Sequence, residues 1–203
     1  MSISTVALLA LGLAVVAAVL IHNRLVALGA RVANAFAQID VQLQRRHELV
    51  PNLVETAKGY LRHERETLLA VTAARDGAER CRTAAGGGAV RGAGAVPSGP
   101  ALDALAGAER TLSGALGRMR IVMEAYPEIR ADAQMRELAD DLESTENRVA
   151  CARQAYADAV MAYNVAQAQF PATLVARATG VRPAAQFELD SGATRAPVAV
   201  SFA

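Results

Sequence analysis

Polar side chains occupy or flank the positions where two packed helices would normally place apolar ones. One group consists of Asn34, Gln38, Asp40, Gln42 and Arg46, and a later group of Glu143, Glu146, Asn147, Arg148 and Arg153. Such residues form either a buried hydrogen-bonded layer that fixes helix register or a polar groove that receives a partner or ligand. The first interpretation predicts an ion pair between Arg46 and one of two carboxylates, Glu143 or Glu146.

Residues that could bind a metal or a nucleotide are few and wrongly spaced. His63 and Glu64 begin the HExxH motif of metalloproteases, but Thr67 stands where the second histidine is required. None of the three histidines lies three residues after a glutamate, so neither a His-rich site nor a di-iron bundle is predicted. The sequence also lacks phosphate-binding glycine loops and the GxSxG nucleophile motif. We therefore expect no metal, no cofactor and no small-molecule substrate.

A novel catalytic site built on Asp40, His47 and Glu55 is an alternative. Acid–base catalysis requires a pocket in which such groups converge, and we expect helical spacing to place these three on different faces. The prediction is therefore a protein that is not an enzyme.

The elements that carry these residues begin with an apolar stretch. The nineteen residues from Ile3 to Ile21 carry no charge. As a helix they would extend about 29 Å, close to the roughly 30 Å hydrocarbon core of a bilayer. A cleaved signal peptide is the alternative, but no Lys or Arg precedes the stretch, and no small-x-small cleavage site closes it. We expect a retained transmembrane helix, and arginines such as Arg24 and Arg31 predict a cytoplasmic location for residue 22 onward.

A heptad pattern follows the apolar stretch directly. Its positions, three and four residues apart, are Leu25, Leu28, Val32, Ala35, Ile39, Gln42, Arg46, Leu49, Leu53, Thr56 and Tyr60. Pro51 either kinks this helix or lies in the first turn of a new one. Because the register continues across Pro51, we predict one kinked helix that reaches about Arg82.

Two further helices are predicted after a glycine-rich connection, residues 84–100. One runs from about Ala101 to Glu124 and ends before Pro127. The other begins near Ala131, with Asp132 as its N-cap, and ends before Pro171. Its large seam residues, at steps of seven, are Leu142, Val149, Tyr156, Tyr163 and Phe170.

The composition favours packed helices. Hydrophobic residues make up 53% of the 203 residues, but aromatic residues only 4%. The formal net charge is +1 and no polybasic block is present, so nucleic-acid binding is not predicted. The two cysteines lie far apart, so no disulfide framework is expected, and Cys151 is interpreted as a small core residue.

Several stretches together resemble the bacterial LemA family. They are residues 34–64 (NAFAQIDVQLQRRHELVPNLVETAKGYLRHE), residues 126–133 (YPEIRADA), residues 145–164 (TENRVACARQAYADAVMAYN), Phe170-Pro171, Gly180-Val181, Phe187-Glu188 and Ala196-Pro197 with Val200-Ser201-Phe202. The sequence departs from the family pattern at His22-Asn23, at Ala157 and in the glycine-rich insert. The resemblance implies a single N-terminal membrane span followed by an elongated antiparallel helical bundle, with no established enzymatic activity.

We therefore predict an all-α protein with a transmembrane anchor at 1–22, a bundle at 23–171 that contains the insert 84–100, and a tail at 172–203. The tail is expected to pack on the bundle through Phe187 and through residues 200–202. The expected location is the bacterial cytoplasmic membrane, crossed once by residues 3–21. The predicted function is a membrane-anchored scaffold that binds a cytoplasmic protein or its own copies. The alternative is a self-assembling protein that organises or senses the membrane, with basic residues near lipid headgroups.

Overall fold

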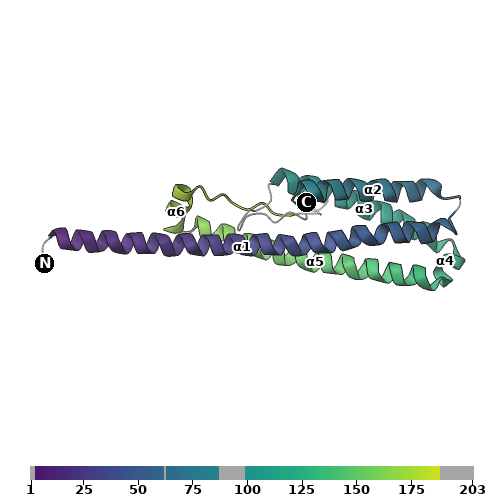
Figure 1. Ribbon diagram of the computed structural model, residues 1–203, viewed down its shortest axis with the longest axis horizontal. Helices are drawn as coiled ribbons and strands as arrows, with labels where there is room; N and C mark the ends of the chain where they lie inside the picture. The colour runs from purple at the N-terminus through teal and green to yellow at the C-terminus, as the bar shows by residue number, and fades with distance from the viewer. Residues whose placement is uncertain (1–2, 62, 87–98, 188–203) are drawn as a thin grey trace, which may run out of the picture.

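The structure, a computed structural model, describes residues 3–61, 63–86 and 99–187. These residues form six helices and no strand, which confirms the predicted all-α class. The long helices are α1 (Ile3–Lys58), α2 (Arg65–Ala84), α3 (Gly99–Glu124) and α5 (Ala133–Ala168), and the short ones are α4 (Pro127–Ala131) and α6 (Ala172–Thr179). Successive long helices run in opposite directions, so the molecule is elongated and the first part of α1 extends alone beyond the bundle (Figure 1).

Helix α1 continues through Pro51 as one helix, as predicted. Pro51 itself is exposed. The predicted heptad positions lie on the covered side of α1, where Val32 and Ile39 are fully buried. A second buried stripe that includes Phe36 and Leu43 was not predicted. It arises because α1, from about Leu25 onward, is covered twice, by α5 and, over its second half, by the α2–α3 hairpin (Figure 1).

The prediction of a helix reaching Arg82 is wrong, because the chain reverses after Lys58 and α2 begins at Arg65. The amides of Tyr60 and Leu61 both donate to the carbonyl of Ala57, at 3.0 and 2.8 Å, which closes α1. Leu61 and Leu68 are seven residues apart and both buried. The apolar period therefore passes through the turn unchanged, and periodicity alone could not reveal it.

Helices α3 and α5 begin and end close to the predicted residues. The α3 helix ends at Glu124, before Pro127, and the short α4 that follows was not predicted. The side chain of Asp132 accepts a hydrogen bond from the amide of Met135 at 2.8 Å, so its predicted role as N-cap of α5 is confirmed. The predicted seam of α5 is buried from Leu142 to Tyr163.

Phe170, the last predicted seam residue of α5, is 81% exposed. The helix ends at Ala168, so the residue leaves the helical register before it reaches the core. The residue before a proline is pushed out of the helical region, and here that residue is Phe170.

The segment after α6 packs on the bundle. Phe187 is buried, as predicted, and Ala184 lies in the same apolar cluster. Residues 200–202 and most of the glycine-rich insert lie outside the described residues. At the ends of that insert, Ala84 closes α2 and Gly99 opens α3.

The N-terminal part of α1 has the length and composition of a membrane-spanning helix. Its most apolar eighteen-residue window has a mean hydropathy of 2.3, and none of that window is buried in the protein. A core helix of comparable hydropathy would be covered by its neighbours, whereas this one presents apolar side chains on all sides.

The cap of α5 is also a tertiary contact, because the hydroxyl of Tyr60 donates to Asp132 Oδ2 at 2.8 Å. Replacing Asp132 with Ala removes both interactions and is expected to lower the Tm by about 2–4 °C. Asp132→Asn is the matched control, because asparagine caps helices equally well. Thermal unfolding followed by circular dichroism checks this, and equal Tm values for the two variants would contradict the capping role.

Candidate functional site: a buried polar layer and an outer groove

Charged residues separate two apolar clusters in the core. One cluster includes Ile39, Leu105 and Tyr156, and the other, nearer α4, includes Leu53 and Leu112. Between them, each long helix contributes at least one residue to a polar layer. Its members are Asp40, Arg46 and His47 on α1, Glu79 and Arg82 on α2, Glu109 and Ser113 on α3, and Glu146 on α5.

Arg46 joins three helices in this layer. Its Nη1 donates to Glu109 Oε2 at 3.1 Å, and its Nη2 donates to Glu146 Oε1 at 2.8 Å and to Ser113 Oγ at 2.9 Å. The pair with Glu146 confirms one of the two predicted partners, while Glu143 is exposed and is not the partner. The guanidinium is buried rather than in open solvent, and both of its Nη atoms are paired, while its Nε has no hydrogen-bond partner among the described residues.

His47 joins α2 and α3 to α1. Its Nε2 lies 2.7 Å from Glu109 Oε1 and its Nδ1 lies 2.8 Å from Glu79 Oε2. Carboxylates only accept hydrogen bonds, so both contacts are hydrogen bonds only when His47 carries hydrogen on both ring nitrogens. Glu109 is completely buried, and its two oxygens face Arg46 and His47.

Arg82 completes the layer on α2. It donates to both oxygens of Glu79, at 2.9 and 3.0 Å, and to Asp40 Oδ1 at 2.8 Å. Hydrogen bonds from Arg82, with a further contribution from His47, lower the pKa of Glu79 to about 2. The same hydrogen bonds raise the pKa of Arg82 above its ordinary value. Glu79 and Arg82 therefore stabilise each other in their charged forms.

The expectation that Asp40, His47 and Glu55 lie on three different faces is wrong for the first two residues and correct for Glu55. Asp40 and His47 lie seven residues apart on one face of α1, and Glu79 and Arg82 connect them. Glu55 is instead an exposed partner of Lys58. The three residues of the catalytic alternative therefore do not converge.

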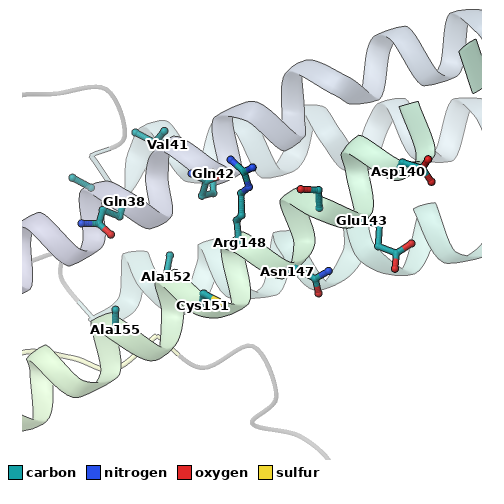
Figure 2. Close-up of a pocket in the computed structure, with 12 residues that line it drawn as sticks. Gln38, Val41, Gln42, Asp140, Glu143, Asn147, Arg148, Cys151, Ala152 and Ala155 are labelled. Carbon is teal, nitrogen blue, oxygen red and sulfur yellow. The ribbon is translucent and has the colours of Figure 1, made fainter. Parts of the chain in front are cut away.

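A groove runs along the outside of α1 and α5 (Figure 2). It has a volume of about 1050 Å³, and α2 and α3 contribute no residue to its lining. Its lining residues are Ala37, Gln38, Val41, Gln42, Asp140, Glu143, Ser144, Asn147, Arg148, Cys151, Ala152 and Ala155. The groove is acidic toward α4 and has a basic residue, Arg148, near its middle.

The polar residues singled out in the sequence thus separate into two sets. Asp40, Arg46 and Glu146 belong to the polar layer. Five line the groove, namely Gln38, Gln42, Glu143, Asn147 and Arg148. The other two, Asn34 and Arg153, line no part of this groove.

Asn34 and Arg153 lie elsewhere on the bundle. Asn34 is exposed. The guanidinium of Arg153 lies 5.8 Å from the ring centroid of Phe187, in the geometry of a cation–π contact. The interpretation of Cys151 as a core residue is wrong, because it is exposed in the groove.

Sequence reasoning missed five members of the polar layer, namely His47, Glu79, Arg82, Glu109 and Ser113. A signal was present for Glu109, which lies four residues after Leu105 and three before Leu112, and so falls on the buried stripe of α3. No pattern in the sequence identifies which helices supply the partners of Glu109 and His47. Among the described residues, no group of three or more His, Cys, Asp or Glu side chains is arranged to hold a metal ion.

Comparison with known proteins fits this architecture. The family model described as "LemA family" matches residues 35–202, which include both the polar layer and the groove. The chain belongs to the LemA family. It is also similar to two proteins of Paramagnetospirillum magneticum (strain ATCC 700264 / AMB-1), magnetosome proteins MamQ 1 and MamQ 2. Each is 33% identical over 85 residues, or 42% of this chain, and the match spans 31% of either relative's length.

The lowered pKa of Glu79 predicts a specific dependence of stability on pH. Its ordinary value is 4.5 and its folded value is about 2, so its contribution is fully present above about pH 4.5 and is lost as pH falls toward 2. Glu79→Gln is therefore expected to be less stable than the wild type at pH 7. The difference should shrink on acidification through that window.

Thermal unfolding between pH 2 and 7 measures this difference. The exposed Glu137→Gln on α5 serves as the matched control and should follow the wild-type curve. A constant gap between wild type and Glu79→Gln at every pH would contradict the assignment.

Proposed function

We propose that this LemA family protein is a membrane-anchored helical scaffold whose α1–α5 groove binds a helix of a partner protein. The groove is the observation that carries the proposal. It offers a long surface with small side chains such as Ala37, Ala152 and Ala155, along which a helix backbone can approach closely. The amides of Gln38 and Asn147 supply hydrogen-bonding groups beside that surface.

Retention of the apolar stretch as the anchor is part of this proposal. Helix α1 runs without a break from Ile3 to Lys58, so the span and the first bundle helix are one rigid element. Leu25, four residues after Ile21, is already buried against the bundle. Arg24 and Arg31 follow the span, and the positive-inside rule then favours a cytoplasmic bundle.

The charge pattern of the groove favours a different protein over a second copy. Copies anchored in one membrane with one orientation would pair α5 with α5 in parallel about a two-fold axis. Asp140 and Glu143 of one copy would then approach the same carboxylates of the other, and Arg148 would approach Arg148. Such like-charge contacts oppose association. A partner helix with basic residues facing Asp140 and Glu143 and an acidic residue facing Arg148 would complement the groove.

Side-by-side self-assembly that organises the membrane is the second candidate. The likeness to two magnetosome proteins over 85 residues is compatible with a role at a membrane. We propose a non-enzymatic role in either case. Support comes from the polar layer, in which the completely buried carboxylate of Glu109 is already paired with Arg46.

Cys151 provides a direct test because it is exposed within the groove. In a Cys81→Ser background, a maleimide photo-crosslinker attached to Cys151 in native membranes is expected to yield an adduct with a second, different protein. Arg148→Glu should reduce that adduct severalfold by reversing the charge that the partner faces. Arg118→Glu, an exposed reversal on α3 outside the groove, should leave the yield unchanged.

Mass spectrometry of the adduct separates the two candidates. An adduct that contains only this chain would contradict the partner proposal and support self-assembly. Equal yields from Arg148→Glu and Arg118→Glu would contradict binding through the groove.

A further inference from the structure

The corner between α5 and α6 lies where α1 leaves its apolar stretch. Ile21, Arg24 and Leu25 of α1 line one small cavity, of about 120 Å³, together with residues 166 and 169–172 at the corner. Figure 1 shows α6 beside α1 at the base of the part that extends alone. If residues 3–21 cross a bilayer, the corner is level with the lipid headgroups.

Large apolar side chains are exposed at this corner. Phe170 is 81% exposed and Leu174, four residues further on, is 56% exposed. Ala176, on the other side of α6, is buried against the bundle. Helix α6 is therefore amphipathic, with Leu174 on its uncovered outer side, and Phe170 is exposed just before the helix begins.

Positive charge gathers at the same end of the molecule from two distant parts of the sequence. Residues 3–39 and 159–187 contain Arg24, Arg31, Arg177 and Arg182 but no Asp or Glu. The formal net charge of the whole chain is only +1, so this end is basic and the remainder is acidic. Arginines flanking exposed apolar residues are typical of surfaces that bind anionic lipid.

The corner is held firmly rather than loosely attached. Asn164 exchanges two hydrogen bonds with the backbone of Ala184, at 2.9 and 3.0 Å. The hydroxyls of Tyr156 and Tyr163 donate to the carbonyls of Ala185 and Arg182, at 2.8 and 3.2 Å. The segment that follows α6 is therefore tied to α5, which fixes α6 relative to the span.

We propose that the α5–α6 corner is a second membrane contact, in which Phe170 and Leu174 enter the headgroup layer and the surrounding arginines bind anionic lipid phosphates. This proposal rests on the membrane anchor of the proposed function. The corner would fix the angle between the bundle and the membrane, which a single span cannot do. The groove would then be presented at a defined height and orientation.

The chain contains no tryptophan, so one introduced indole reports on one position. Full-length Phe170→Trp and Leu174→Trp are reconstituted into vesicles of mixed zwitterionic and anionic phospholipids, with or without brominated acyl chains that quench indole emission. Leu11→Trp, within the span, is the positive control. Ile121→Trp, 69% exposed on α3 near the α4 end, is the matched negative control.

The tryptophans at positions 170 and 174 are expected to emit at a shorter wavelength than the tryptophan at position 121. Brominated lipid should quench their fluorescence. Replacing the anionic lipid by a zwitterionic one should reduce this quenching, while Leu11→Trp stays fully quenched. Emission at both corner positions that matches Ile121→Trp, with Leu11→Trp quenched, would overturn the corner contact and leave the anchor intact. An unquenched Leu11→Trp would instead overturn the anchor. Quenching at the corner that is equal in both lipids would overturn the role assigned to the arginines.

Discussion

The completely buried carboxylate of Glu109 sets the main constraint on this bundle. A charge removed from water is costly unless donors surround it. Here Arg46 donates to it and His47 Nε2 lies 2.7 Å from it, and further nitrogens of these two residues reach Glu146 on α5 and Glu79 on α2. Four helices must therefore be aligned at one level for all of these contacts to form together. Alanine-rich heptad stripes alone would permit several registers, and the polar layer selects one.

The two sides of α1 have different roles in the bundle. The inner side carries the charged contacts and the apolar stripes, so the outer side is free to form the groove with α5. The two ends of the molecule differ as well. One end combines the lone apolar helix with arginines, and the groove extends away from it toward the acidic residues Asp140 and Glu143. The proposed scaffold, anchored in a membrane with its helical surface above it, would use this difference between the two ends.

Much of the fold could be predicted because its signals are local. The apolar stretch, the seam of α5, the Asp132 cap and the Arg46–Glu146 pair all follow from spacing and residue type. The hairpin after Lys58 was missed because Leu61 and Leu68 keep the apolar period through the turn. Phe170 was assigned to the core because the seven-residue apolar spacing of α5 continues to it. The helix ends at Ala168, before that residue, because Pro171 follows. The partners of His47 depend on which helices pack together, and one sequence does not encode that in any local pattern.

Hydrogen exchange of backbone amides, read by mass spectrometry, tests most directly whether the layer couples the helices. In the wild type, peptides around residues 40–47, 79–82, 109–113 and 146 should be strongly protected. In Glu109→Gln, which leaves the shape of the side chain unchanged, we predict faster exchange in all four helices, because removing one partner of a buried charge network costs about 3 kcal/mol or more. Glu124→Gln at the exposed end of α3 should change none of them. Faster exchange confined to α3 would contradict the account.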